Sequence, residues 1–234
     1  MNSNVSSVSL FGGQRCHGRR AQCGPPLLAR APPSLYGALD ATFSRNLGQG
    51  NEMRLTIAAH DDADSIVDLV NQAYRGASSG GWTTEAGLIE GPRVNRAVVA
   101  EMIENGQATV LLARDQAPKQ IQGCVAVRPM EDHQWYLSML AVGPAFQTGG
   151  LGKSIMTAAE AFLAERGARS VKISVIDVRD SLIAWYERRG YERTGDIEPF
   201  PYDDPSVGVP LRDDLTLITL RKSLRTSDPA ETRQ

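Results

Sequence analysis

A glycine-rich segment in the middle of the chain has the composition of a phosphate-binding turn. It covers residues 147–153 (QTGGLGK), after an apolar run at residues 135–142 and at the start of an amphipathic stretch at residues 151–166. Glycines let a ligand approach the backbone closely, and the unpaired N–H groups and dipole at a helix start attract anions. We therefore predict a strand, a turn that binds an anion such as a pyrophosphate, and a helix.

Two classes of phosphate ligand fit this turn. Residues 147–154 approach the G-x-x-x-x-G-K-S/T loop of nucleoside triphosphatases, but Gln147 replaces the first glycine of that loop. That loop also opens a parallel sheet, whereas the strands expected before residue 147 form an antiparallel meander. The other ligand is acyl-CoA, because Gln147, Gly150 and Gly152 fit the pattern Arg/Gln-x-x-Gly-x-Gly/Ala. A nucleoside triphosphatase is kept as a distant third function, behind the two acyl-CoA functions described below.

The hydrophobic periodicity of the remaining chain indicates the elements that must position this turn. Apolar residues recur at helical spacing or fall in short runs bounded by polar linkers. The helical connection at residues 151–166 makes the strands before and after it parallel. One helix is expected to begin near residue 62, and three more are expected at 94–105, 151–166 and 181–189. The expected strands are 54–59, 108–113, 121–127, 135–142, 171–176, 192–199 and 215–224.

With these motifs and this order of elements, the chain resembles the GNAT acetyltransferase superfamily from Met53 to about Leu224. A second block supports the resemblance, because Tyr186, Gly190 and Tyr191 match the family pattern Tyr-x-x-x-Gly-Phe/Tyr. The resemblance implies an α/β (α+β) fold with a mixed, mostly antiparallel central sheet. It also implies a splayed pair of parallel strands and about four flanking helices.

The resemblance further implies that acetyl-CoA is the cosubstrate and that no metal takes part. In the family, the pantetheine arm lies in the gap between the two parallel strands, here along the backbone of Leu140, Ala141 and Val142. The pyrophosphate is expected on the N–H groups of the glycine turn. The cofactor-binding residues expected on that turn are Gln147, Thr148, Gly149, Gly150, Leu151, Gly152 and Lys153.

A tyrosine and a loop carboxylate are the candidate catalytic residues. Tyr186 occupies the family position of the general acid, where a phenol can protonate the departing thiolate. Glu85 lies in the expected loop of residues 76–91, where relatives build the acceptor pocket, and is a candidate base or acceptor contact. Arg179 stands where the family often has a cofactor-binding asparagine, and an arginine there suits a phosphate. Cys124, inside an expected strand, is interpreted as a core residue.

These features predict an N-acetyltransferase that moves an acetyl group from the thioester to a primary amine by direct attack in a ternary complex. The alternative from another class is a non-catalytic acyl-CoA-binding regulatory module with the same fold. Tyr186 distinguishes the two, since a sensor needs no acid there. The expected acceptor is a small-molecule or peptide amine, and protein N-termini, lysine, amino acids, polyamines and antibiotics all remain candidates. A homodimer is a further option for the assembly.

Composition and charge narrow the class of protein and its partners. The 234 residues are 41% hydrophobic and 22% charged, as in a globular protein, and contain no apolar run that would span a membrane. Three cysteines and three histidines match no zinc or disulfide framework, so we expect a reducing compartment and no metal site. From residue 53 onward, 20 basic and 25 acidic side chains disfavour a nucleic-acid partner and suit amines.

The first 52 residues differ from the rest in composition. They hold five arginines against Asp40 and Glu52, no lysine and little hydrophobic periodicity. We expect a disordered extension, an upstream-start artefact or an organelle transit segment at 1–52. The acetyltransferase domain is then 53–224, followed by a disordered tail at 225–234. The expected location is the cytoplasm, or a mitochondrion or other organelle if residues 1–52 are a transit peptide.

Overall fold

The computed structural model describes residues 42–46, 52–76, 84–106, 108–114 and 120–224. The helices are α1 (Ala63–Arg75), α2 (Arg96–Glu104), α3 (Leu151–Ala164) and α4 (Asp180–Glu187), and short 3-10 turns cover His60–Asp62, Pro144–Gly149 and Pro205–Val207. The strands are β1 (Thr42–Asn46), β2 (Glu52–Ile57), β3 (Ile89–Glu90), β4 (Thr109–Arg114), β5 (Ile121–Pro129), β6 (Gln134–Val142), β7 (Ser170–Ile176), β8 (Glu192–Pro199), β9 (Val209–Pro210) and β10 (Thr216–Ser223).

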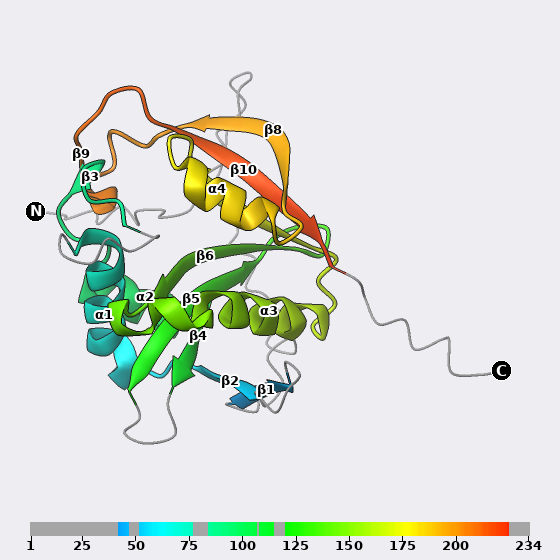
Figure 1. Ribbon diagram of the computed structural model, residues 1–234. Helices are drawn as coiled ribbons and strands as arrows, with labels where there is room; N and C mark the ends of the chain where they lie inside the picture. The colour runs from blue at the N-terminus through cyan, green and yellow to red at the C-terminus, as the bar shows by residue number, and fades with distance from the viewer. Residues whose placement is uncertain (1–41, 47–51, 77–83, 107, 115–119, 225–234) are drawn as a thin grey trace, which may run out of the picture.

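Within these residues, eight strands form one sheet in the order β1-β2-β4-β5-β6-β7-β10-β8 (Figure 1). Neighbouring strands in it run antiparallel except β6 and β7, which run parallel because the α3 crossover joins them. β3 and β9 form a separate two-stranded sheet. The predicted fold class, a mixed and mostly antiparallel sheet with one parallel pair and flanking helices, is therefore confirmed.

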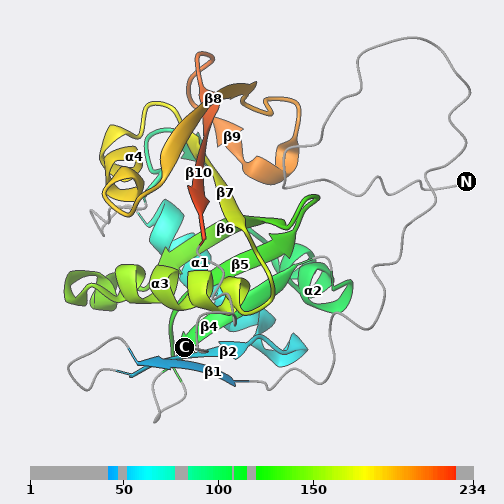
Figure 2. The same ribbon diagram turned by 90° about the vertical axis from the view of Figure 1, so that its right-hand side faces the viewer.

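Helices cover both faces of the sheet, and alternate strand residues face each side. Leu111 of β4 and Val125 of β5 pack into the core formed with α3 and α4, while Leu112 and Cys124 pack into the core formed with α1 and α2. Figure 2 shows α3 and α2 on opposite sides of the central strands. The central strands are therefore buried on both faces.

Local sequence signals explain where the helices lie and end. Gly167 and Gly190, which follow α3 and α4, adopt φ of +79° and +82°, a left-handed conformation that suits glycine after a helix. None of the helices in the described part of the chain has the length and apolar character needed to cross a membrane. Four apolar positions at helical spacing form the inner face of α1, and all four are buried: Ile66, Leu69, Val70 and Ala73.

The large sheet begins earlier than the sequence indicates. β1 falls inside the segment 1–52 that we expect to lie outside the domain, yet it pairs antiparallel with β2 over all five of its residues. Phe43 packs edge-on against Phe162 of α3, with ring centroids 5.7 Å apart. Its neighbours in β1 are polar, so the strand carries no hydrophobic periodicity. The domain therefore includes β1, ahead of the expected start at Met53, while the expectations for residues 1–41 and 225–234 lie outside the described residues.

Phe43→Ala should lower the free energy of unfolding of the full-length chain by about 2 kcal/mol, because it removes a partly buried ring and its contact with Phe162. Urea denaturation followed by circular dichroism measures the loss. Ser44→Ala, at an exposed position of the same strand, is the control and should change stability by less than about 0.5 kcal/mol. Equal stability of Phe43→Ala and the parent would show that β1 is not anchored on α3.

Candidate active site

β6 and β7 separate along their length. They pair in parallel over only three residues of each strand, Gln134–Tyr136 with Ser170–Lys172. Beyond Tyr136, β6 has no partner in β7, and the two strands diverge (Figure 2). The predicted pantetheine-binding residues 140–142 lie at this open end, and all three are buried.

A β-bulge in β6 shapes the open end. Two residues of β6, Met139 and Leu140, lie opposite the single residue Val125 of β5. Met139 adopts φ of +53°, which is uncommon for a residue with a side chain. The bulge places Leu140 and Val142 in the core with α3 and α4, and Met139 and Ala141 in the core with α1 and α2.

Two side chains contact carbonyl groups at the bulge. Tyr74, near the end of α1, donates its hydroxyl to the Leu140 carbonyl at 3.0 Å, and the Cys124 Sγ lies 3.6 Å from the Met139 carbonyl. Burial raises the pKa of the Tyr74 phenol and that of the Cys124 thiol to about 12, so both groups remain protonated donors. Cys124 is a core residue, as expected, but no sequence signal points to Tyr74, because its partner is 66 residues away.

The glycine turn has the geometry of an anion site. The 3-10 turn at Pro144–Gly149 leads to Gly150 (φ +74°, ψ 10°), which is the N-cap of α3 and provides no side-chain cap. Thr148, Gly149, Gly150 and Lys153 are exposed, and a Cβ on either glycine would meet no atom within 4 Å. The uncapped N–H groups at the start of α3 therefore border open space that an anion can enter.

The remaining three residues predicted to bind the cofactor on this turn face the protein rather than solvent. Gln147 donates its side-chain amide to the Val142 carbonyl at 3.1 Å and so closes the turn against the end of β6. Leu151 packs against the core under α3, and Gly152 is buried. These three residues shape the turn, and their backbone is the part left for a ligand.

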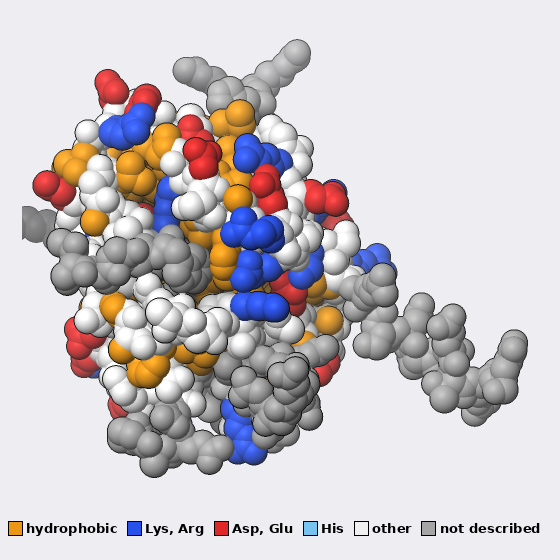
Figure 3. Space-filling view, in the orientation of Figure 1, with side chains coloured by type: hydrophobic (Ala, Val, Ile, Leu, Met, Phe, Trp, Pro, Cys, Tyr) orange, Lys and Arg blue, Asp and Glu red, His pale blue; other side chains and the backbone are white. Residues whose placement is uncertain are grey.

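The molecular face that carries α3 and α4 is basic between these two helices. Figure 3 shows Lys and Arg side chains gathered there, on the face turned to the viewer in Figure 1. A basic surface raises the local concentration of a polyanion. The surface charge therefore favours a phosphate-bearing ligand on the same side as the helix whose start forms the glycine turn.

Tyr186 of α4 lies in the core between α3 and α4. It is 6% exposed, and its ring packs edge-on against Trp185 and Tyr191, with centroid distances of 5.0 and 5.6 Å. Burial, together with the nearby Tyr74 phenol, raises the pKa of Tyr186 far above its ordinary value. The phenol is therefore protonated and can donate a hydrogen bond, whereas complete proton transfer to a thiolate with an ordinary pKa of about 8.5 is uphill.

Glu85 is buried among arginines. Its backbone N–H donates to the Tyr74 carbonyl at 2.7 Å, and its side chain is 8% exposed. Arg75 donates to the carboxylate Oε2, and Arg93 Nε lies 4.0 Å from the same atom. Arg179 Nη1 lies 3.4 Å from the other oxygen, Oε1. We call Glu85, Arg75, Arg93 and Arg179 the Glu85 cluster.

The Glu85 cluster lies beside the two buried tyrosines. The charge of Arg179 acts on the phenols of both Tyr74 and Tyr186, and the Arg93 guanidinium carbon lies 5.6 Å from the centre of the Tyr74 ring. The fold thus brings the two candidate catalytic residues, Tyr186 and Glu85, to one region. Arg179, for which the sequence suggests a phosphate contact, contacts Glu85 at the tyrosine end of the site.

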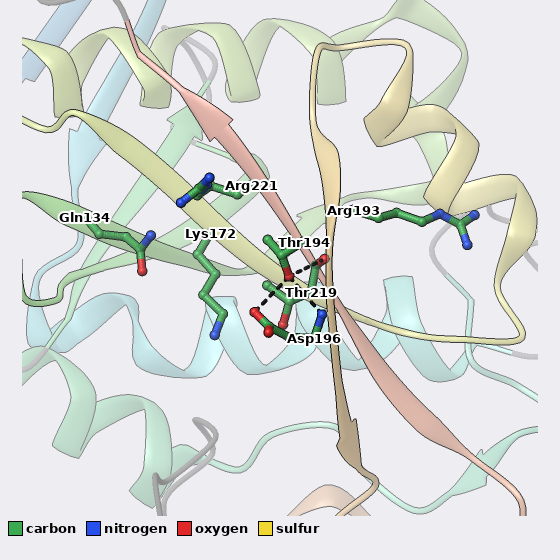
Figure 4. A pocket seen from close by; sticks show the side chains of 7 residues that line it. All are labelled: Gln134, Lys172, Arg193, Thr194, Asp196, Thr219 and Arg221. Atoms are coloured by element: carbon green, nitrogen blue, oxygen red, sulfur yellow. Dashed lines mark hydrogen bonds between the residues drawn. The ribbon is translucent and has the colours of Figure 1, made fainter.

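A polar cavity of about 410 Å³ lies over β7, β10 and β8 (Figure 4). Thr194 Oγ1 donates to the Asp196 carboxylate at 2.8 Å, and Arg193 points away from the cavity to Glu187. None of the predicted site residues lines it. No group of three or more His, Cys, Asp or Glu side chains in the described ranges is placed to hold a metal ion. The residues that line the polar cavity are Gln134, Lys172, Arg193, Thr194, Asp196, Thr219 and Arg221.

Comparison with known proteins agrees with this geometry. The Acetyltransferase (GNAT) family matches residues 68–191, more than half of the chain, and no curated protein matches it. An acetyltransferase of the GNAT family from Staphylococcus aureus Mu50 is similar in structure, with a TM-score of 0.51 at 13% identity over 74% of this chain and 99% of that one.

Two further solved structures share the fold. Ribosomal-protein-alanine N-acetyltransferase from Brucella melitensis has a TM-score of 0.53 at 21% identity, over 73% of this chain and 99% of its own. A candidate acetyltransferase from Salmonella typhimurium, solved with its cofactor acetyl-CoA, has a TM-score of 0.54 at 18% identity. The match covers 78% of this chain and 100% of that one. At these identities the likeness shows the fold alone.

Glu85→Gln should destabilise the protein by about 3 kcal/mol, because it leaves buried guanidinium groups without their carboxylate. Thermal and urea unfolding measure the loss. Glu90→Gln makes the same chemical change at an exposed position five residues later and should change stability by less than about 0.5 kcal/mol. A Glu85→Gln protein as stable as the parent would show that the cluster does not hold this part of the chain together.

Proposed function

Because the chain belongs to the GNAT acetyltransferase family, we propose that it is an N-acetyltransferase that moves an acetyl group from acetyl-CoA to a primary amine. The observation that carries this proposal is an uncapped helix start with open space at Gly149 and Gly150, placed at the end of a strand that separates from its parallel neighbour. A long ligand with a pyrophosphate near one end and a thioester at the other suits such a site.

The residues present fit acetyl-CoA in chemistry and in order. The N–H groups from Thr148 to Lys153 are suited to the pyrophosphate, because they are backbone donors at the positive end of the α3 dipole. The backbone of residues 140–142 borders the gap between β6 and β7 and can pair with the amide groups of the pantetheine arm. Gln147 supports this arrangement by joining the turn to Val142.

The reaction we propose is direct attack in a ternary complex. The neutral amine nitrogen forms a bond to the thioester carbonyl carbon, the C–S bond breaks, and the amine loses its proton to water. Tyr186, which is protonated, passes its hydroxyl proton to the departing sulfur, and the proton that the amine gives to water returns to the Tyr186 oxygen in the same step, so no phenolate is left behind. The products are the N-acetylated amine and free coenzyme A, so every atom of both substrates is accounted for.

We assign Glu85 to the acceptor side of the site rather than to proton transfer. Arg75 and Arg179 each donate to one of its two carboxylate oxygens, which leaves it poorly placed to accept a proton from an amine. A carboxylate in this position holds arginine side chains in place. An arginine of the Glu85 cluster, rather than Glu85 itself, is then the group that meets an acceptor.

Gly150→Glu should weaken coenzyme A binding at least about tenfold, or about 1.4 kcal/mol, because it places a carboxylate where the pyrophosphate binds. Isothermal titration calorimetry measures this affinity. Gly167→Glu is the matched control, since Gly167 follows the other end of α3, also has a positive φ and also has open space around its Cβ position. Both variants share the cost of a left-handed side chain, so only the first should lose affinity. Unchanged binding by Gly150→Glu, or tight magnesium-dependent ATP binding by the parent, would contradict the proposed cofactor site.

Tyr186→Phe should slow acetyl transfer by roughly 10²-fold, the usual scale for losing a general acid, while leaving coenzyme A affinity unchanged. Part of the rate should return at higher pH, where the thiolate leaves without a proton. Single-turnover measurements with a working amine test this. Tyr191→Phe, which removes a buried hydroxyl bonded to Glu160, is the control and should keep its rate. If the Tyr186→Phe rate equals that of the parent, Tyr186 takes no part, and a non-catalytic acyl-CoA-binding module becomes the better interpretation.

A further inference from the structure

The Glu85 cluster holds more positive than negative charge. Three guanidinium groups lie within 4.0 Å of one carboxylate, so the cluster carries a formal surplus of two positive charges. The side chains of Arg75, Arg179 and Arg93 are only 10%, 8% and 23% exposed. Buried charges are costly unless a counter-charge or hydrogen bonds compensate them. The surplus therefore needs an explanation.

Arg75 has a structural role that uses its own donors. Its Nε donates to the Gly91 carbonyl at 3.0 Å, its Nη2 donates to the Val207 carbonyl at 3.2 Å, and its Nη1 donates to Glu85. It thus joins the end of α1 to the chain beside β3 and to the 3-10 turn before β9, two strands that lie side by side in Figure 1. Arg75 and Glu85 form a structural pair, which leaves Arg93 and Arg179 as the other two cations of the cluster, and Arg179 also contacts the Glu85 carboxylate.

Arg93 is the more accessible of these two. Apart from Glu85 at 4.0 Å and the face of the Tyr74 ring, its guanidinium has no hydrogen-bond or ion-pair partner among the residues that the structure describes. The segment 77–83, which precedes Glu85 in the chain, contains no acidic residue that could supply a counter-charge. Glu198, whose charge acts on nearby Tyr136, is 3.6 Å from Lys172 and is already paired. The described protein therefore leaves Arg93 with unused donors.

The surplus lies at the reacting end of the proposed site. Arg179 acts on both Tyr74 and Tyr186, and Tyr74 bonds the Leu140 carbonyl at the bulge. The phosphates of the cosubstrate are expected at the other end, on the turn at Gly150, while its thioester and pantetheine amides carry no charge. An anion that uses the remaining donors of Arg93 must then come from the acceptor.

We propose that the acceptor is an amino acid whose carboxylate binds Arg93, with the charge of Arg179 adding to the attraction; this proposal depends on the acetyltransferase function proposed above. A guanidinium binds a carboxylate through two parallel N–H donors, and such pairs are strong when partly buried. Because the arginines lie beside the tyrosines, the carboxylate must be close to the reacting amine, as in an α-amino acid. Polyamines, aminoglycosides and lysine-rich peptides bring further positive charge and are repelled.

The first test compares matched amines. The full-length protein is assayed for coenzyme A release with the L-amino acids, their carboxamides and their decarboxylated amines. Amino acids should give a kcat/KM at least tenfold above the matching amide and amine. Arg93→Gln should reduce kcat/KM for the best amino acid at least tenfold, mainly through KM, without changing the KM for acetyl-CoA. Arg96→Gln removes the same charge from an exposed residue paired with Asp64 and should behave as the parent does.

The second test needs no turnover. N-acetyl-L-amino acids, which are the expected products, should bind to the protein saturated with coenzyme A in calorimetry, and Arg93→Gln should weaken that binding at least tenfold. The carboxamides of the same N-acetyl-L-amino acids lack the carboxylate, so the parent and Arg93→Gln should bind them with equal affinity.

The two tests separate this proposal from the proposed function. If amides, decarboxylated amines or spermidine are acetylated as well as or better than amino acids, the carboxylate proposal is wrong and the acetyltransferase function stands. If N-acetyl amino acids bind through Arg93 but no amine is acetylated, the carboxylate proposal stands and the catalytic function is wrong. If neither acetylation nor Arg93-dependent binding is found, both are wrong.

Discussion

Two parallel strands that stop pairing leave backbone N–H and C=O groups without partners, and burying such groups is costly. This constraint acts at β6 and β7, which pair over only three residues and then diverge. The protein meets part of it with its own side chains, since Tyr74 bonds the Leu140 carbonyl at the Met139 bulge. The rest can be met by a ligand with amide groups of its own. The feature that weakens the sheet is thus the one that creates the proposed cofactor site.

The two ends of that site depend on different physical effects. At the glycine turn, binding relies on backbone donors and the α3 dipole, so side chains matter mainly by being absent, as at Gly149 and Gly150. At the tyrosine end, burial holds the phenols of Tyr74 and Tyr186 in the protonated form. The same low polarity strengthens the field of the buried arginines. One end therefore suits a phosphate group, and the other suits a small polar reaction centre.

A buried ion pair links this chemistry to the architecture around it. Arg75 and Glu85 connect the end of α1 to the segments that carry β3 and β9, so the chain on the proposed acceptor side depends on a charge pair rather than on apolar packing alone. Removing one partner of such a pair costs more than the pair contributes, because the other charge remains buried. Arg93 and Arg179 lie beside this ion pair and beside the tyrosines.

The sequence by itself determined the parts of this protein that depend on neighbours along the chain. Strand, glycines and helix adjoin at residues 135–166, so the turn and its preference for an anion were predicted from local conformation alone. Tertiary structure decided the rest: β1 joins the sheet with one aromatic residue among polar ones, and Glu85, expected on a loop, lies buried against Arg179, 94 residues later in the chain. Burial and ion pairing depend on side chains that only the complete fold brings together, whereas backbone conformation at a turn depends on the residues beside it.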